Sequence, residues 1–268
     1  MGAQRTAVVT GSGRGIGKAT VELLQAHGVN VIGVDLAGAD INADLSTLEG
    51  REALEAGVRE RCPAGIDVIV ANAGVLTDDE LSIQVNYFGA VETLERLRPM
   101  LRSDAPRVVV VASRSVLKPV DHAIVEACLD GDEARAVALA QQTGSPHLLY
   151  ATGKRAIARW IRRNAGLPAW AGAGIALNGV APGAVLTPMI AQRDPAEQAR
   201  LAVERPMPLG GMATAEEVAA LIDFLADAKN SKIAGQLIFI DGGGETLMGQ
   251  EDIWEAMVNK QASTATAN

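Results

Sequence analysis

The chain has 268 residues, a formal net charge of −8 and a pI near 5.0, and this length suffices for one large α/β domain with a sizeable core. The acidic balance argues against nucleic acid or an anionic membrane surface as a partner, because both require clustered positive charge. No apolar run approaches the roughly 18 residues that a membrane span needs, and the first strand pattern begins almost at once, which leaves no room for a signal peptide. We therefore expect a cytoplasmic protein.

Cysteine and histidine residues are few and scattered. Cys62 and Cys128 lie far apart without metal-ligand spacing, and they indicate free thiols in a reducing compartment. His27, His122 and His147 form no pair and are interpreted as ordinary surface or helix-end residues. The sequence predicts no metal site.

The first chemical signal is a glycine-rich stretch over residues 10–17. A β-branched apolar run at residues 6–9 precedes it, and apolar positions at helical spacing follow it as far as Gly28. Glycine lets the backbone turn sharply and approach a pyrophosphate, while the helix N-terminus offers its N–H groups to negative charge. The alternative is a tight turn without a ligand, but the next strand pattern, residues 29–34 ending in Asp35, favours a dinucleotide-binding βαβ unit.

Strand and helix patterns alternate along the rest of the chain, as they do in doubly wound folds. Nearly continuous apolar runs, typical of strands buried on both faces of a parallel sheet, cover residues 66–71, 107–112, 175–180 and 237–240. Helices are predicted after a capping box that begins at Ser46, from Leu81 toward Met100, from Tyr150 onward, after Asp194-Pro195, and after a capping box that begins at Thr214.

We predict a single α/β domain over residues 1–260, with a Rossmann-type, mostly parallel, seven-stranded sheet and helices on both faces. Residues 261–268 are small and polar and are predicted to form a flexible tail. The segment at about 116–149 is predicted to be a helical insertion, since two short helical patterns, at 123–129 and 133–141, precede a turn at 144–146.

The order of the motifs carries a resemblance that covers nearly the whole chain. The glycine loop is followed by Asn72-Ala73-Gly74, Asn86, a serine at the end of the 107–112 strand, Tyr150 with Lys154, and Pro182-Gly183 with Thr187. In this order the motifs resemble the short-chain dehydrogenase/reductase family. Within it, residues 34–36, 43–47 and 85–90 and the long stretch before Tyr150 look most like the bacterial 3α-hydroxysteroid dehydrogenase/carbonyl reductase group.

The resemblance implies hydride transfer between an alcohol carbon and a nicotinamide ring, during which a proton must move at the oxygen. Tyr150 is the predicted acid/base. An unperturbed phenol has a pKa near ~10, and an ammonium held close to a phenol lowers its pKa. Lys154 lies one helical turn further on and on the same face. The alternative is that Tyr150 is an interface aromatic and Lys154 a solvated surface charge.

Two further residues are assigned by the resemblance. The family's substrate-orienting serine ends the fifth strand, and the spacing from Arg107 points to Ser113 rather than Ser115. Otherwise Ser113 is a strand-end serine that caps backbone groups. Asn86 would hold a water that links Lys154 to solvent, or else it is an asparagine that satisfies a distorted helical turn.

The cofactor residues point in two directions. A carboxylate at Asp35 accepts both ribose hydroxyls and repels a 2′-phosphate, which favours NAD, whereas by the resemblance Arg14 accompanies NADP. We predict NAD, with NADP less favoured, because the Asp35 carboxylate would directly repel a 2′-phosphate, whereas the Arg14 side chain can turn to solvent. The predicted cofactor-binding residues are Gly11, Arg14, Gly15, Ile16, Gly17, Asp35, Leu36, Asp44, Leu45, Asn72, Ala73, Gly74, Tyr150, Lys154, Val185 and Thr187.

The predicted function is NAD-dependent interconversion of a secondary, cyclic, steroid- or terpenoid-like alcohol and its ketone, by a homodimer or homotetramer. The alternatives are a non-catalytic dinucleotide sensor of the same fold and a nucleotide-sugar epimerase or dehydratase. The latter usually needs a larger C-terminal substrate region. We also expect residues 116–149 to cover the substrate and to contribute to a subunit interface, because their apolar residues exceed what two solvated helices should expose. The alternative is a helical pair packed on its own domain.

Overall fold

The computed structural model describes residues 4–102, 104–186 and 206–249, and one seven-stranded sheet organises this part of the chain. The strand order is β3-β2-β1-β4-β5-β6-β7, and every neighbouring pair is parallel. The strands are β1 Thr6–Thr10, β2 Asn30–Asp35, β3 Ile41–Asn42, β4 Val68–Ala71, β5 Arg107–Val111, β6 Ala176–Pro182 and β7 Leu237–Ile240. The predicted fold class is confirmed. Only β3 lacked a sequence pattern, because two residues are too few to show a periodicity.

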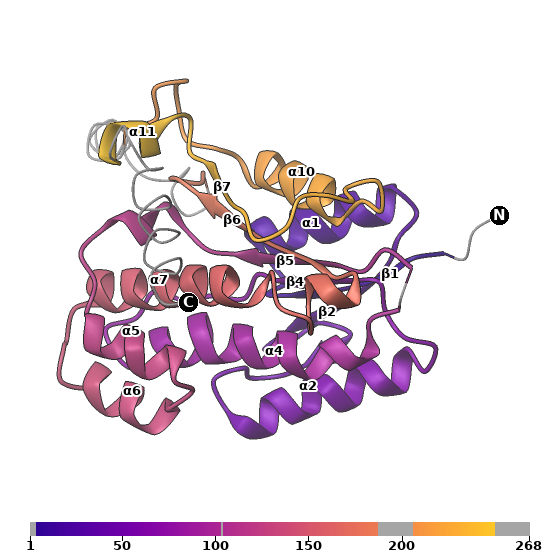
Figure 1. Ribbon diagram of the computed structural model, residues 1–268, viewed down its shortest axis with the longest axis horizontal. Coiled ribbons are helices and arrows are strands. Elements are labelled where there is room, and N and C mark those ends of the chain that lie inside the picture. Colours follow the sequence, from indigo (N-terminus) through magenta and orange to yellow (C-terminus); the bar gives the residue numbers. More distant parts are fainter. Residues whose placement is uncertain (1–3, 103, 187–205, 250–268) are drawn as a thin grey trace, which may run out of the picture.

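Helices cover both faces of the sheet (Figure 1). On one face α1 (Gly15–Ala26) packs against α10 (Ala215–Ala226), and the other face carries α2 (Leu48–Arg61), α4 (Ala90–Leu97) and α7 (Pro146–Asn164). The remaining helical elements are α3 Leu81–Ile83, η1 Gln84–Gly89, η2 Arg98–Met100, η3 Arg114–Leu117, α5 His122–Leu129, α6 Glu133–Ala140, η4 Ala171–Ala173 and α11 Gly244–Met248. None of the helices in the described ranges is long and apolar enough to cross a membrane.

Two apolar clusters hold the layers together. In β1, Val8 belongs to the cluster on the α2, α4 and α7 face, whereas Ala7 and Val9 belong to the cluster under α1 and α10. Every residue of β4 and β5 is buried. Because successive side chains point to opposite faces and both faces are covered, these central strands are nearly continuously apolar, as predicted, with Arg107 at the start of β5 as the exception.

Two capping predictions had different outcomes. The Thr214 capping box is confirmed, since the Thr214 hydroxyl accepts from the Glu217 N–H and the Glu217 carboxylate accepts from the Thr214 N–H. The Ser46 box is wrong by one residue. Thr47 is the N-cap of α2 and accepts from the Gly50 N–H at 3.0 Å, while the Ser46 hydroxyl donates to Asp44 instead.

The helix that carries Tyr150 begins earlier than predicted. Ser145 precedes α7, and Pro146 occupies its first turn, so these residues start the helix rather than close a loop. Proline suits this position because its missing N–H is not needed there. Tyr150 therefore lies in the second turn, with His147 one turn before it.

The helical insertion consists of α5 and α6, each within one residue of its predicted bounds. Its apolar side chains Ile124, Val125, Cys128, Ala136 and Ala140 are fully buried, with α5 packed on α6 and α7. The chain's own domain covers them, so these residues give no support for the expected subunit interface, which stays a prediction. Both cysteines are free, as predicted, and the structure also buries them. The Asp194 helix start, Thr187 and the tail at 261–268 lie outside the described residues.

Candidate active site

The glycine loop places an open helix N-terminus at the carboxyl end of β1. Arg14 is the N-cap of α1 and contributes no side-chain capping bond, and no acidic residue occupies the first turn. Gly15 has a φ of +54° and open space where a Cβ would lie, whereas a Cβ at Gly17 would lie 2.0 Å from the Gly11 carbonyl oxygen. Gly17 is thus required for packing and Gly15 for the turn. The loop fits an anionic group such as a pyrophosphate at the helix N-terminus.

The Asn72-Ala73-Gly74 turn after β4 fixes this loop from the side. The Asn72 side-chain amide donates to the carbonyl oxygens of Thr10 at 2.9 Å and Gly11 at 3.2 Å. The Thr10 hydroxyl accepts from the N–H groups of Asn72 and Ala73. The two predicted motifs, which lie about sixty residues apart in the chain, therefore form one hydrogen-bonded unit.

Two carboxylates lie at the far end of the cleft, where β2 and β3 end. Asp35 accepts from the N–H of Gly13 and from the N–H of Leu36, each at 2.8 Å, so it holds the glycine loop as well as facing the cleft. Asp44 accepts from the N–H and the hydroxyl of Ser46. A carboxylate oxygen has two lone pairs, so the bonded Asp35 can still accept from ribose hydroxyls.

Lys154 is the buried cation of the site. It is 3% exposed, and its Nζ donates to the Val111 carbonyl oxygen at 2.8 Å. Burial lowers the pKa of this amine to about 8, so the ammonium form still dominates at neutral pH. Its Nζ lies 5.7 Å from the centre of the Tyr150 ring. The structure therefore brings the two predicted residues together, against the interpretation of Lys154 as a solvated surface charge.

Asn86 lies in a π-helical stretch, η1, that interrupts the long helix predicted from Leu81. Its side-chain amide donates to the Val75 carbonyl oxygen at 2.8 Å, and its oxygen accepts from the Val75 N–H at 2.9 Å. A Cβ at Gly74 would lie 2.9 Å from the Asn86 oxygen and 3.4 Å from the Lys154 Nζ. π-helical turns occur frequently at functional sites, and this one brings Asn86 beside Lys154. The water predicted at Asn86 stays a prediction.

Both serines after β5 face the cleft. Ser113 is the N-cap of η3, and its hydroxyl oxygen accepts from the Ser115 N–H at 3.1 Å. This contact leaves the Ser113 O–H able to donate to a substrate oxygen. The Ser115 hydroxyl is buried and has no hydrogen-bond partner among the described residues.

A buried arginine that the sequence reasoning missed supports the Asp44 end of the cleft. Arg51 on α2 is 4% exposed, and it donates to the carbonyl oxygens of Leu45 at 2.8 Å and Ser46 at 3.2 Å. Both of its terminal nitrogens bind the Glu133 carboxylate, each at 2.7 Å. Glu133 belongs to the insertion, so α6 is joined through one guanidinium to the segment that contains the predicted cofactor-binding residues Asp44 and Leu45.

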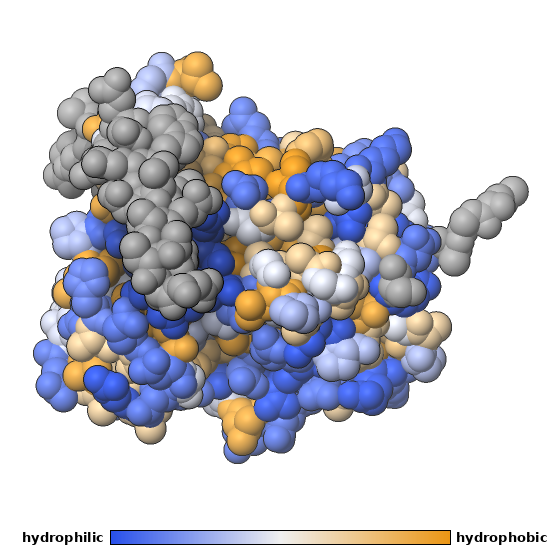
Figure 2. All heavy atoms as spheres, in the orientation of Figure 1, coloured by the Kyte–Doolittle hydropathy of each residue, from blue (hydrophilic) through white to orange (hydrophobic). Residues whose placement is uncertain are grey.

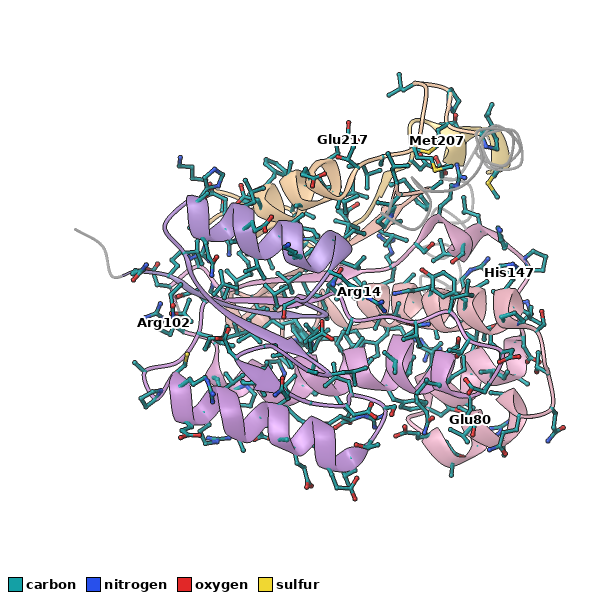
Figure 3. The ribbon with its side chains drawn as sticks, turned by 180° about the vertical axis from the view of Figure 1, so that it is seen from behind. Arg14, Glu80, Arg102, His147, Met207 and Glu217 are labelled. Atoms are coloured by element: carbon teal, nitrogen blue, oxygen red, sulfur yellow. The ribbon has the colours of Figure 1, made fainter. Side chains whose placement is uncertain are left out.

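A single cleft of about 640 Å³ joins these parts. Its lining includes most of the predicted site residues: Gly11, Arg14, Ile16, Asp35, Leu36, Asp44, Leu45, Asn72, Ala73, Gly74, Ser113, Tyr150, Lys154 and Val185. Gly15, Gly17 and Asn86 do not line the cleft, but they shape or contact the segments that do. In Figure 3, Arg14 lies near the middle of the molecule and His147 lies toward the end opposite Arg102. The described residues contain no group of three His, Cys, Asp or Glu side chains that could hold a metal ion.

The cleft also has lining residues that the sequence reasoning missed or interpreted otherwise. They include Leu76, Leu81, Arg114, Ser115, Lys118, His147 and Met248. For His147 a signal existed, since Ser145-Pro146 is a helix start and His147 lies three residues before Tyr150. Arg114 is buried, donates to the Pro206 carbonyl oxygen at 2.7 Å and lies 3.6 Å from an Asp241 carboxylate oxygen. It joins η3 to the segment after β7.

Comparison with known proteins agrees with this geometry. The family described as enoyl-(acyl carrier protein) reductase matches residues 11–245. The chain is 36% identical over 251 residues to the 3-alpha-hydroxysteroid dehydrogenase/carbonyl reductase of Comamonas testosteroni, covering 90% of this chain and 96% of the relative. The chain belongs to the short-chain dehydrogenase/reductase family.

Two further relatives also match nearly the whole chain. The solved 3-alpha-hydroxysteroid dehydrogenase from Pseudomonas sp. B-0831, complexed with NADH, is 41% identical with a TM-score of 0.83 and covers 92% of this chain and 100% of its own. The cis-4-hydroxycyclohexanecarboxylate dehydrogenase of Sinomonas cyclohexanicum is 30% identical over 262 residues, covering 90% of this chain and 96% of its own. The chain is an oxidoreductase of this family, similar to hydroxysteroid dehydrogenases.

Proposed function

We propose that this protein catalyses the NAD-dependent interconversion of a secondary cyclic alcohol, steroid- or terpenoid-like, and its ketone. The observation that carries this proposal is the convergence of Tyr150, Lys154 and Ser113 on one cleft whose other end has a dinucleotide-type loop. The relatives named for 3α-hydroxysteroids and for a hydroxycyclohexane acid support a ring-bearing alcohol.

In this proposal the chain's residues control the proton and the substrate's orientation. Tyr150 accepts the proton of the alcohol through its phenolic oxygen, and returns it in the reverse direction. The Lys154 ammonium, fixed on the Val111 carbonyl, favours the phenolate electrostatically. The Ser113 hydroxyl donates to the substrate oxygen. When bound, NAD supplies the hydride acceptor.

NAD rather than NADP is proposed because Asp35 lies at the cleft wall after β2. A 2′-phosphate there would face a carboxylate that the loop N–H of Gly13 holds in place. Like charges brought together without a counterion are unfavourable. The relative whose structure was solved with NADH is consistent with this preference. Arg14, exposed in the same loop, is the residue that would favour the phosphate.

We further propose that the protein acts in the cytoplasm as a homodimer or homotetramer on a small-molecule substrate. Apolar residues gather over β7 and α10 in Figure 2. The edge strand β7 is only half-buried along its length, and Phe224 of α10 is exposed. Unpaired strand edges and apolar patches favour association. This face, rather than the insertion, supports the predicted assembly.

The test is a panel of cyclic secondary alcohols, including 3α-hydroxysteroids and substituted cyclohexanols, assayed with NAD and with NADP by the absorbance of the reduced cofactor. We expect turnover of at least one ring alcohol and a higher kcat/KM with NAD. Absence of turnover for every alcohol, with binding of NADH intact, would support the non-catalytic sensor instead. A higher kcat/KM with NADP would overturn the assignment to Asp35.

A further inference from the structure

Arg114 is a buried charge in the wall of the cleft, one residue after Ser113. It belongs to η3, is 7% exposed and lines the cleft. Its guanidinium donates to the Pro206 carbonyl oxygen at 2.7 Å and lies 3.6 Å from a carboxylate oxygen of Asp241, which is 3% exposed. Burying an arginine costs free energy that its partners must offset, so the role of this residue lies in the contacts that it makes.

The Arg114–Asp241 pair is a weak source of stability. The Asp241 Oδ1 accepts from the Gly243 N–H at 3.2 Å, but Oδ2, the oxygen that faces Arg114, has no hydrogen bond in the part of the chain that the structure describes. A buried ion pair offsets its loss of hydration only when further hydrogen bonds complete it, and apolar replacements of such pairs are often neutral or stabilising. The pair is therefore better explained by what it positions.

The guanidinium lies between two segments of the C-terminal part of the chain. One segment contains Pro206, and the other is the turn into α11, where a Cβ on Gly244 would clash with both the Arg114 Nη1 and the Pro206 carbonyl oxygen. Figure 3 shows Met207 of the first segment beside α11, and α11 also contacts η3. Arg114 therefore ties both segments to the turn that carries Ser113.

The helix α11 presents a large apolar side chain to the cleft. Met248 is 43% exposed and lines the cleft, as Tyr150 and Ser113 do. Exposed apolar side chains in a concave site are typical of ligand-binding walls. The reacting oxygen of a substrate belongs at Tyr150 and Ser113, so the apolar body beyond that oxygen is the part that can reach Met248.

We propose that Arg114 is a positioning residue, which holds α11 so that Met248 packs against the apolar body of the substrate. The inference rests on the proposed function and adds which residues favour an alcohol larger than a single ring. Arg114 acts through Met248 and takes no part in the proton transfer. The preference comes from apolar contact, because one methylene in a hydrophobic pocket changes kcat/KM by about tenfold or more.

The experiment compares 2-decalol, a secondary alcohol with two fused rings, with cyclohexanol, which has one, by kcat/KM with NAD. We expect the decalol-to-cyclohexanol ratio to fall about tenfold in Met248→Ala and in Arg114→Met. The variant with both substitutions should have about the same ratio as either alone, because both act on one contact. Gly244→Ala, which crowds the guanidinium without removing either charge, should lower the ratio as well.

A second comparison separates positioning from stability. Arg114→Met leaves the buried Asp241 without its counter-charge and should lower the midpoint of denaturant unfolding, and adding Asp241→Asn should restore the midpoint. The low decalol-to-cyclohexanol ratio should remain in this double variant, because the link to Pro206 is still missing. Arg102→Met with Asp67→Asn removes an arginine–aspartate pair outside the cleft and is the matched control, which should keep the wild-type ratio.

A ratio that recovers together with the unfolding midpoint would overturn the proposal, because the role of Arg114 would then be structural only. Additive effects of Arg114→Met and Met248→Ala would overturn it too. Turnover of both alcohols with the wild-type ratio in every variant would do so while leaving the proposed function intact. Absence of turnover of every ring alcohol by the wild type, with NADH binding intact, would instead count against the proposed function, and this inference would fall with it.

Discussion

The two ends of the cleft are built in opposite ways. The end toward β2 is made from main-chain groups and carboxylates that bond to their own loops, as Asp35 does with Gly13. The end toward β5 and α7 is made around a buried amine, Lys154, whose pKa is lowered because burial penalises its charge. The polar groups named at the first end have their hydrogen-bond partners within the protein before any ligand arrives. The second end keeps an unfavourable charge in place, which is consistent with the catalytic role that we propose for it.

The largest effect should come from Tyr150→Phe, which removes the proton-moving oxygen from the reacting end and leaves the dinucleotide end untouched. We expect kcat to fall about 10³-fold or more, with the dissociation constant for NADH, measured by fluorescence titration, within about twofold of wild type. Turnover close to that of the wild type would show that the two ends are not divided as we describe.

Lys154→Met tests the cost of the buried charge. The pKa of Lys154 is about 8 in the folded chain and 10.5 ordinarily. Below about pH 8 Lys154 is protonated in both the folded and the unfolded chain, so the buried ammonium lowers the stability by its full amount. Between about 8 and 10.5 the unfolded chain binds a proton that the folded chain has lost, so stability rises with pH. The penalty is on the order of 3 kcal/mol.

We therefore expect Lys154→Met to lose activity and yet raise the free energy of unfolding at pH 7 by about 1–3 kcal/mol. This range allows for the loss of the hydrogen bond to the Val111 carbonyl oxygen. The gain should disappear near pH 10. Denaturant unfolding of the protein without cofactor at pH 7 and pH 10 measures it, and Lys18→Met on the surface should show no such pH dependence. A destabilised Lys154→Met at pH 7 would contradict the charge penalty.

Asp35→Ala tests the dinucleotide end of the cleft. Removing this carboxylate should raise KM for NAD about tenfold, because the ribose loses an acceptor, and should lower KM for NADP, because the repulsion of the 2′-phosphate is gone and Arg14 is available. Steady-state kinetics with both cofactors at saturating alcohol measures the change. Equal losses with NAD and NADP would mean that Asp35 only supports the loop through Gly13.

The smallest effect should come from Glu133→Gln in α6. This variant weakens the hold on Arg51, which positions the Leu45 and Ser46 carbonyls. We expect KM for NAD to rise about threefold to fivefold with kcat unchanged, and unfolding free energy to fall by about 1–2 kcal/mol. Glu126→Gln on α5, which also removes an ion pair of the insertion, is the matched control and should leave KM for NAD unchanged.

The parts of the site that the sequence predicted well are contiguous motifs. The glycine loop, Asp35 and the Tyr150–Lys154 spacing each lie within a few residues, so local chemistry identifies them. The π-helical turn at Asn86 was missed because its residues are as apolar as those of an α-helix. The Arg51–Glu133 pair was missed because 82 positions separate its members. Ser46 was predicted as the N-cap instead of Thr47 because both residue types cap helices. Only the hydrogen bond from Ser46 to Asp44 in the structure distinguishes the two residues.

The Arg51–Glu133 pair also limits how the insertion can be engineered. A designer who shortens residues 117–146 to a tight turn would leave a guanidinium, 4% exposed, without its carboxylate. An unpaired buried charge typically costs about 3–5 kcal/mol, enough to unfold many domains. A shortened version would therefore need Arg51→Met or Arg51→Leu at the same time, and a graft of the insertion onto a relative would need an arginine at the position of Arg51.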